Sequence, residues 1–369
     1  MMLVLRKTIW KFIRIYGKLK KIPDDYAASL LLRSFADDYR QHIYPFWKIA
    51  CIHRKGFTAS DWSFLDLDYH DYSKYLTNLQ YCRMHPLNGK YGYIIDSKLS
   101  LKQHCVGTPL DQYMPEYYFR ITDSGKLLGL SDYKDSDSQE PTWNDLVQLL
   151  KEKRSLAVKR NAGSIGEGFY KCEYIEGRCF ANGAPLQNPE EFFSNLRDYL
   201  ITEYLVPHPD IAKICPDTAN ALRYLAGRVD GELQFLKGFI RFGTRASGFV
   251  ENYNAGGVLC YLDQQGAFTY GNVVDKHKHS NVIIEKHPDS NVELKGTIPC
   301  WSCIQKAVKE FGNQFPMLDY LGFDFVITVE EKTKILEINS LTSVDALQLD
   351  GSILETNAER FFKKYGVVQ

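Results

Sequence analysis

The chain has 369 residues, of which 44% are hydrophobic and 24% are charged, a composition typical of a globular protein with two or three domains. The 45 basic residues equal the 45 acidic ones in number, and this balance argues against a nucleic-acid-binding protein. No apolar run approaches the roughly 20 residues that cross a bilayer. The 9 cysteines follow no repeating frame, which indicates reduced thiols and a cytoplasmic location.

Residues 3–21 predict a basic amphipathic helix. Ile9, Phe12, Ile13 and Tyr16 recur at helical spacing and are expected on one side, and no acidic residue precedes Asp24. Two interpretations stay open: peripheral contact with the inner face of an anionic membrane, or packing of the apolar stripe on the body of the protein. The basic residues of this segment are Arg6, Lys7, Lys11, Arg14, Lys18, Lys20 and Lys21.

Further along the chain, helical and strand patterns alternate without a repeat. Residues 24–85 read as mostly helical, and a short strand is expected at 91–98, followed by a helix. Residues 116–121, 155–160, 169–174 and 199–206 predict strands, and 223–229 with 232–242 predict a hairpin around Asp230-Gly231. Helices are expected after Thr142, after Asn188 and from Trp301. Antiparallel strands mixed with helices indicate the α+β class.

Two apolar runs near the C-terminus, 322–329 and 334–339, flank a polar turn and predict a hairpin. A turn centred on Glu331 and Lys332 sets Asp324 opposite Asn339, and Val326 opposite Glu337. Glu337 and Asn339 share a face because they are two residues apart. Two carboxylates and an amide oxygen on one patch suit Mg²⁺. The alternative is an ordinary exposed strand face with polar residues.

A Gly-rich turn at 161–168 lies between two predicted strands. It therefore fits neither a Walker loop nor a dinucleotide-binding turn, both of which join a strand to a helix. Such a hairpin can fold over phosphates and offer backbone N–H groups, with Lys159 on the preceding strand within reach of a phosphate. The alternative is a plain tight turn.

Roughly residues 90–345 contain, in this order, a strand lysine, a Gly-rich turn, a strand ending in Glu203, Arg-bearing strands and an Asp…Glu-x-Asn motif. This order resembles that of the ATP-grasp superfamily. The stretches Leu222-Arg223-Tyr224 and Asn254-Ala255-Gly256-Gly257-Val258 resemble its sugar-transfer-associated family. This resemblance implies an ATP-grasp fold with two α+β subdomains clasping ATP. The expected units are a helical N-terminal region, 1–90, an N-terminal subdomain, 91–206, and a C-terminal subdomain, 207–369.

The resemblance also implies site residues. Arg241 and Arg223 are the expected catalytic residues, and Asp324, Glu337 and Asn339 the expected metal ligands. Many ligases of this superfamily carry an arginine shortly before the first metal acid, where this chain has Leu321-Gly322. The residues expected to bind nucleotide are Lys98, Lys159, Gly163, Ser164, Gly166, Gly168, Glu203, Tyr204, Leu205, Val206 and Asp210.

The activity implied is that of an ATP- and Mg²⁺-dependent carboxylate–amine ligase acting through an acyl phosphate. The expected substrates are an amino acid or other amine and a sugar-linked carboxylate of surface polysaccharide biosynthesis. The alternatives are a small-molecule kinase on the same fold and a non-catalytic nucleotide-binding partner of a polysaccharide assembly. No nucleic-acid partner is expected, and the sequence leaves the oligomeric state open.

Overall fold

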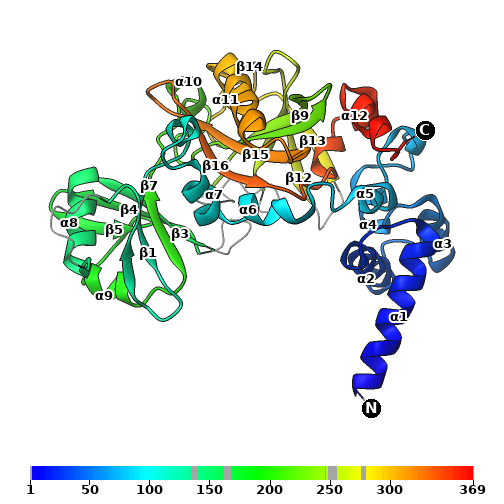
Figure 1. Cartoon of the computed structure of the whole chain (residues 1–369). Coiled ribbons are helices and arrows are strands. Elements are labelled where there is room, and N and C mark those ends of the chain that lie inside the picture. The colour runs from blue at the N-terminus through cyan, green and yellow to red at the C-terminus, as the bar shows by residue number, and fades with distance from the viewer. Residues whose placement is uncertain are drawn as a thin grey trace.

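The computed structural model describes residues 2–133, 140–161, 168–245, 247, 256–275 and 280–368. Its parts form an arch (Figure 1). A sheet-containing lobe stands at one end, a second sheet with its helices forms the middle, and the N-terminal helices stand at the other end. Mixed helices and antiparallel sheets confirm the α+β class.

The first sheet forms the lobe at one end of the arch. Over the described residues it has seven antiparallel strands, in the spatial order β2 (Leu127–Gly129), β1 (Tyr117–Ile121), β7 (Tyr199–Glu203), β3 (Ser155–Arg160), β4 (Tyr170–Ile175), β5 (Arg178–Ala181) and β6 (Ala184–Pro185). Helices α8 (Trp143–Lys153) and α9 (Pro189–Ser194) accompany it. The expected strands and helix starts of this lobe are confirmed, except that the strand expected at 199–206 ends at Glu203.

Local sequence explains how α8 begins and which face it buries. Thr142 accepts a hydrogen bond from the backbone N–H of Asp145, whose carboxylate accepts from the N–H of Thr142 in return, so both ends of a capping box are present. Leu146 and Leu150, one helical turn apart, are buried in the core that the helix shares with the sheet.

The second sheet forms the middle of the arch. Its seven antiparallel strands within the described ranges are, in spatial order, β13 (Ser280–Ile284), β12 (Gly271–Asp275), β10 (Val258–Tyr261), β9 (Glu232–Phe242), β8 (Leu222–Val229), β15 (Tyr320–Ile327) and β16 (Thr333–Asn339). Helix α11 (Trp301–Gln314) lies above it in Figure 1. The shorter elements nearby are α10 (Pro209–Ala212), β11 (Ala267–Phe268), β14 (Gly296–Thr297), and the 3₁₀ turns η5 (Ala346–Gln348) and η6 (Ile353–Glu355).

Both faces of this second sheet are packed. Tyr224 of β8 and Phe323 of β15 join the core that contains α11. Their neighbours Leu225 and Tyr320 join a second core that includes α12 (Ala358–Lys364) and N-terminal helices. Because side chains alternate between the faces of a strand, a polar residue beside Tyr224 or Phe323 must point away from α11.

The N-terminal helices form the other end of the arch: α1 (Met2–Lys20), α2 (Asp25–Gln41), α3 (Phe46–Lys55), α4 (Ala59–Phe64), η1 (Tyr72–Lys74) and α5 (Asn78–Met84). The expected helical character of residues 24–85 is confirmed. Among the described residues, no helix is both long and apolar enough to pass through a bilayer.

The strand expected at 91–98 is wrong. These residues form η2 (Gly89–Tyr91) and α6 (Gly92–Asp96), and α7 (Lys98–Cys105) and η3 (Pro109–Tyr113) follow. Ile95, Leu101 and Leu110 are buried in the α11 core, so this segment, which we assigned to the N-terminal subdomain, packs with the second sheet. Burial of one side of the helix outweighs the intrinsic β-strand propensity of Tyr93-Ile94-Ile95.

The register expected for the last hairpin is also wrong, although the hairpin itself is confirmed. Asp324 pairs with Glu337, not Asn339, and Val326 pairs with Lys334, not Glu337. A bulge next to Asp324 inserts Leu336 as an extra residue, and the turn falls earlier than Glu331-Lys332. Asp324 and Glu337 are therefore direct neighbours across the two strands.

His85 gives the fold a testable pH dependence. It is 4% exposed, its ring stacks edge-on with Tyr81 and Tyr320, and neither ring nitrogen has a hydrogen-bond partner in the described part of the chain. Burial lowers the pKa of His85 to about 4. Because the unfolded chain takes up this proton near pH 6.5, stability present at pH 7 is lost as the pH falls toward 4, by about 2 kcal/mol between pH 7 and pH 5.

Urea unfolding at pH 7 and pH 5 checks this prediction. The variant His85→Phe keeps an aromatic ring between Tyr81 and Tyr320 and cannot take up the proton. The free energy of unfolding of this variant should therefore fall less between pH 7 and pH 5 than that of the wild type. All other titrating groups are the same in the two proteins, so the difference reports on His85. Equal losses in the two proteins would show that His85 is not the group responsible.

Candidate functional site

Strand alternation gathers three charged residues on the sheet face opposite α11. Arg223 lies between Leu222 and Tyr224, Arg241 lies between Ile240 and Phe242, and Asp324 lies between Phe323 and Phe325. All six neighbours belong to the α11 core, so the charged side chains point the other way. Arg223 is also the direct cross-strand partner of Asp324.

Asp324 is held by both arginines. Its Oδ1 accepts from Arg223 Nε at 2.6 Å, and its Oδ2 accepts from Arg223 Nη2 at 3.1 Å and from Arg241 Nη2 at 3.0 Å. Burial alone would raise the pKa of Asp324, but the two guanidinium groups outweigh it and hold that pKa well below its usual range. Asp324 is thus ionised, and two arginine side chains hold its carboxylate in place.

Glu337 and Asn339 lie beside Asp324. Glu337 Oε2 accepts from Lys98 Nζ at 2.9 Å, and Asn339 Nδ2 donates to Glu337 Oε1 at 3.4 Å. Lys98 reaches this point from the first turn of α7, whose N-terminus is capped by Ser97. The structure therefore brings the three expected metal ligands together, with one expected nucleotide lysine among them.

The donor set fits a hard divalent cation. Asp324 Oδ1 accepts one hydrogen bond from Arg223, whereas a carboxylate oxygen offers about two acceptor positions. Glu337 is about a third exposed and contributes a second carboxylate, and Asn339 an amide. Oxygen ligands of this kind suit Mg²⁺. Within the described ranges, no group of three or more His, Cys, Asp or Glu residues is arranged to hold a metal ion.

Lys159 approaches the same place from the first sheet. Burial, reinforced by the Lys98 ammonium and opposed by Glu337, lowers the pKa of Lys159 to about 8. Its Nζ lies 5.5 Å from the centre of the Tyr117 ring. Both expected lysines therefore act on Glu337, Lys98 from α7 beside the second sheet and Lys159 from β3 of the first sheet, so the site spans the junction of the two subdomains.

The variant Lys159→Ala is expected to weaken ATP binding by about 1.5–3 kcal/mol, roughly 10- to 150-fold, because it removes a charge-assisted contact to phosphate. Lys126, just before β2 and paired with Glu140, is the matched control: Lys126→Ala removes the same charge from an exposed position of the same lobe. Titration calorimetry with a non-hydrolysable ATP analogue measures both. Normal affinity in Lys159→Ala would show that this lysine does not contact the nucleotide.

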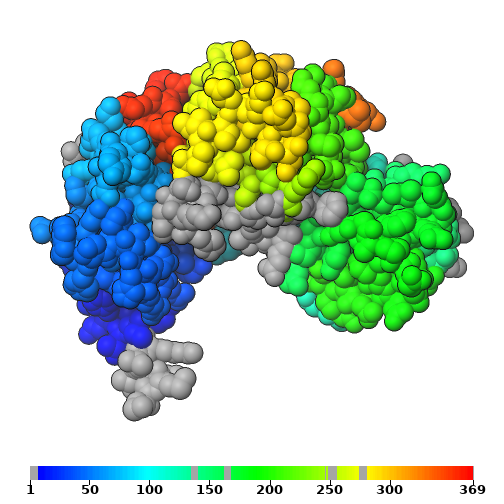
Figure 2. Space-filling model, turned by 180° about the vertical axis from the view of Figure 1, so that it is seen from behind, coloured from blue at the N-terminus to red at the C-terminus, as the bar shows by residue number. Residues whose placement is uncertain are grey.

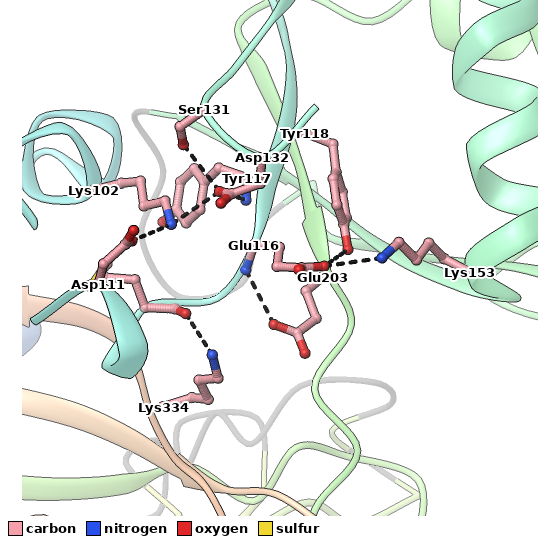
Figure 3. A network of polar contacts seen from close by, with 11 residues as sticks. Lys102, Asp111, Glu116, Tyr117, Tyr118, Ser131, Asp132, Lys153, Glu203 and Lys334 are labelled. Carbon is pink, nitrogen blue, oxygen red and sulfur yellow. Dashed lines mark hydrogen bonds and ion pairs between the residues drawn. The ribbon is translucent and has the colours of Figure 1, made fainter. Parts of the chain in front are cut away.

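A polar network joins the two subdomains next to this site (Figure 3). Lys102 of α7 is almost fully buried and contacts Asp111 at 2.7 Å and Asp132 at 3.0 Å. Lys334 of β16 donates to the carbonyl of Met114, just ahead of β1. Side chains from the second sheet and its helices thereby form ion pairs and hydrogen bonds with the segment that leads into the first sheet.

The expected adenine-reading segment follows β7. The Glu203 carboxylate accepts from the N–H of Glu116, and the Val206 carbonyl accepts from the N–H of Val329. Leu205 is buried with Ala221 and Val326, and Lys171 stacks over the Tyr204 ring at 4.9 Å. Both ends of this segment are thus anchored, one to each subdomain, beside the network of Figure 3.

Two groups of expected residues stand apart from this cluster. Asp210 is the second residue of α10, is exposed and contacts Lys213 at 3.3 Å. The turn residues Gly163, Ser164 and Gly166 lie outside the described residues. Gly168 is described, with φ of 71°, and a Cβ there would meet the Tyr199 hydroxyl at 2.7 Å, so glycine is required.

The missing arginine before Asp324 has a structural explanation. A Cβ on Gly322 would lie 1.8 Å from Thr342 Oγ1, so no side chain fits there. The neighbouring strand β8 supplies a guanidinium instead, because Arg223 pairs directly with Asp324 and its Nη1 lies 3.5 Å from Thr342 Oγ1. The departure at Leu321-Gly322 therefore does not leave Asp324 without an arginine.

Sequence reasoning missed Lys102 and Tyr117. Lys102 lies four residues after Lys98, so a helical interpretation of this segment would have placed both lysines on one side. Tyr117 is fully buried, with Lys159 and Lys102 over its ring at 5.5 and 5.9 Å. No pattern in the sequence distinguishes it from the many other tyrosines.

Comparisons with known proteins complete this description. No curated protein sequence matches the chain. Similar solved structures include D-alanyl-alanine synthetase A from Vibrio cholerae, 13% identical with a TM-score of 0.40, which covers 74% of this chain and 63% of that one. An L-amino acid ligase from Bacillus licheniformis is 8% identical with a TM-score of 0.39, covering 74% of this chain and 47% of that one. The chain thus spans less than two thirds of either.

The sequence itself matches a family model described as sugar-transfer associated ATP-grasp, over residues 88–361. This range includes both sheets, the Gly-rich turn and every residue of the site described above. It begins after the N-terminal helices α1–α5. Since the match covers well over half of the sequence, the chain belongs to the sugar-transfer associated ATP-grasp family.

Proposed function

We propose that this protein is an ATP-dependent carboxylate–amine ligase that works through an acyl phosphate. The observation that carries the proposal is the convergence of four cationic side chains on two carboxylates at the subdomain junction. The surplus of positive charge suits a polyphosphate, and the carboxylates with Asn339 suit the Mg²⁺ that accompanies it. Family membership supports ATP as the nucleotide.

Each residue then has a chemical role. Lys98 and Lys159 would bind phosphate oxygens of ATP from opposite sides of the junction. Glu337, Asn339 and Asp324 Oδ1 would hold Mg²⁺, which supplies neutralisation of charge on the phosphates. Arg223 would orient Asp324 through its two hydrogen bonds. Arg241 would stabilise the equatorial oxygens of the phosphoryl group in transfer.

The reaction would proceed in two steps. An oxygen of the substrate carboxylate attacks the γ-phosphorus of ATP, and ADP departs with the electrons of the broken P–O bond. The nitrogen of an amine then attacks the carbonyl carbon of the acyl phosphate, inorganic phosphate leaves, and the nitrogen loses a proton. The products are an amide, ADP and phosphate. The lobes on either side of the junction would shield the acyl phosphate from water.

For the substrates, we propose a sugar-linked carboxylate and an amino acid or other amine. The family description links these proteins with sugar transfer, which supports a uronic-acid-type carboxylate. The N-terminal helices α1–α5 lie outside the family match, and α5 with the residues just before it contacts the segment after β16. Tyr81 donates to the carbonyl of Leu341, and Gln348 bonds the backbone of Leu76. This contact favours a role of the helices in the choice of acceptor.

A product analysis tests the proposal. Purified protein is incubated with ATP, Mg²⁺ and pairs drawn from uronic acids, their nucleotide-linked forms and amino acids, while ADP and phosphate are measured separately. A ligase releases ADP and phosphate in equal amounts only when both acceptors are present. Release of ADP without phosphate in the presence of one sugar would identify a kinase instead, and ATP binding without turnover on any pair would favour the non-catalytic partner.

A further inference from the structure

Helix α1 is attached to the body along one face. Ile13 is 7% exposed and lies in a small core with Ala28 and Leu31 of α2. A Cβ on Gly17 would lie 3.5 Å from the Cβ of Ala28, so the two helices are in close contact at that point. Arg14 Nε adds an ion pair with Asp25 at 2.8 Å. The packing that the sequence allowed as an alternative is therefore real, and Ile13, Tyr16 and Gly17 are the buried or half-buried residues that carry it in the middle of the helix.

A different apolar stripe of α1 faces solvent. Phe12, Ile15 and Leu19 are 60%, 49% and 77% exposed. Their spacing of three and four residues places them on one side of the helix, roughly 100–160° around the axis from Ile13. Ile9, also exposed, lies one turn before Phe12, between this stripe and the packing face. Together the four side chains form an exposed apolar surface, whereas the solvent-facing side of a helix usually carries polar and charged residues.

A basic stripe runs beside the apolar one. Lys7, Lys11 and Lys18 recur at four and seven residues and are exposed, and Arg14 lies among them. No acidic residue precedes Asp24, so α1 has no negative charge of its own to balance them. Packing face, apolar stripe and basic stripe thus occupy different sides of one helix.

Apart from its contacts with the neighbouring N-terminal helices, α1 projects from the molecule. In Figure 1 it projects from the N-terminal helices away from both sheets, with the N-terminus at its far tip. Figure 2 shows the described part of α1 from behind, in dark blue at the edge of the molecule. Phe12, Ile15 and Leu19 are exposed along this projecting helix, so a flat surface can reach them.

We propose that α1 binds an anionic membrane surface, with Phe12, Ile15 and Leu19 inserted among the lipids and Lys7, Lys11 and Lys18 at the phosphate headgroups. The charge complementarity of an acid-free basic helix with anionic lipids selects this partner, and the exposed stripe supplies the apolar contact that a lipid interface accommodates. The helix lies in the interface and does not span it. The inference is independent of the proposed ligase activity.

Co-sedimentation of the full-length protein with vesicles tests the proposal. Vesicles of phosphatidylcholine mixed with phosphatidylglycerol should bind the protein, and vesicles of phosphatidylcholine alone should not. Binding should weaken as salt rises from about 0.05 M to about 0.5 M, because the attraction is screened. Binding that is equal on both vesicles and indifferent to salt overturns the proposal.

Two variants separate the stripes without touching the packing face. Lys7→Gln/Lys11→Gln/Lys18→Gln should weaken binding roughly fivefold per lysine, on the order of a hundredfold in all. Phe12→Ser/Ile15→Ser/Leu19→Ser should weaken it at least about tenfold. The matched control Lys126→Gln/Lys306→Gln/Lys309→Gln removes three exposed lysines from other parts of the surface and should bind as the wild type does.

Circular dichroism and sedimentation velocity of the same variants complete the test. Native spectra are expected, since none of the exchanged side chains is buried. Wild-type binding by the apolar-stripe variant overturns the proposal. The proposal is also overturned if the wild-type protein does not bind vesicles and is a dimer, while the apolar-stripe variant is a monomer. A second copy of the chain would then be the partner that covers the stripe.

Discussion

Exchange of Glu337 for glutamine is expected to reduce ATP-dependent turnover on the order of 10²- to 10³-fold and to leave the fold intact. The side chain keeps its shape and its hydrogen bond from Lys98, but it loses the charge that would help to hold Mg²⁺ against the phosphates. Because Glu337 is about a third exposed, neutralising it costs little stability. ADP release at saturating ATP, measured across a range of Mg²⁺ concentrations, gives the effect.

Glu330→Gln is the matched control for this experiment. Glu330 lies in the turn of the same hairpin, is exposed and pairs with Lys332, so its charge is remote from the site. Its loss should leave turnover and the Mg²⁺ requirement unchanged. If Glu337→Gln turned over ATP at the wild-type rate, the proposed metal site would be wrong, whatever the substrates prove to be.

The sequence predicted the composition of this site better than its geometry. Asp324, Glu337 and Asn339 were found because an acid, an acid and an amide follow at fixed spacing within an apolar hairpin. The cross-strand pairing of these residues was not predicted correctly. Ile335, Leu336 and Ile338 are apolar whichever register the hairpin adopts, and only packing against the α11 core selects one of the two registers. Ile335 and Ile338 both enter that core although they are three residues apart, and a bulge is needed to allow this.

Contacts between distant segments were beyond the reach of the sequence. The pairing of Arg223 with Asp324 joins residues 101 positions apart, and it depends on β8 lying beside β15. The approach of Lys159 to Lys98 depends on the position of one sheet relative to the other. Local signals such as the Thr142 and Asn188 caps were readable because their partners lie three residues away.

The two arginines of the site are expected to differ in function, and the second large effect follows from this. Arg223 directs both arms of its guanidinium at Asp324 and also lies near Thr342, so it serves mainly to orient the carboxylate. Arg241 reaches one oxygen of Asp324 from β9, farther along the sheet. We therefore assign contact with the transferred phosphoryl group to Arg241.

Arg241→Ala should lower kcat on the order of 10²- to 10³-fold with little change in the KM for ATP, because the lost contact forms mainly in the transition state. Arg241→Lys keeps the charge but not the planar fork, so it should recover only part of the rate. Arg223→Lys should instead raise the Mg²⁺ concentration needed for half-maximal rate, since Asp324 loses one of its two Arg223 bonds. Steady-state kinetics at varied ATP and Mg²⁺ separate the three variants. A raised KM with unchanged kcat in Arg241→Ala would show that Arg241 binds ATP in the ground state, and the phosphoryl role would then pass to Arg223.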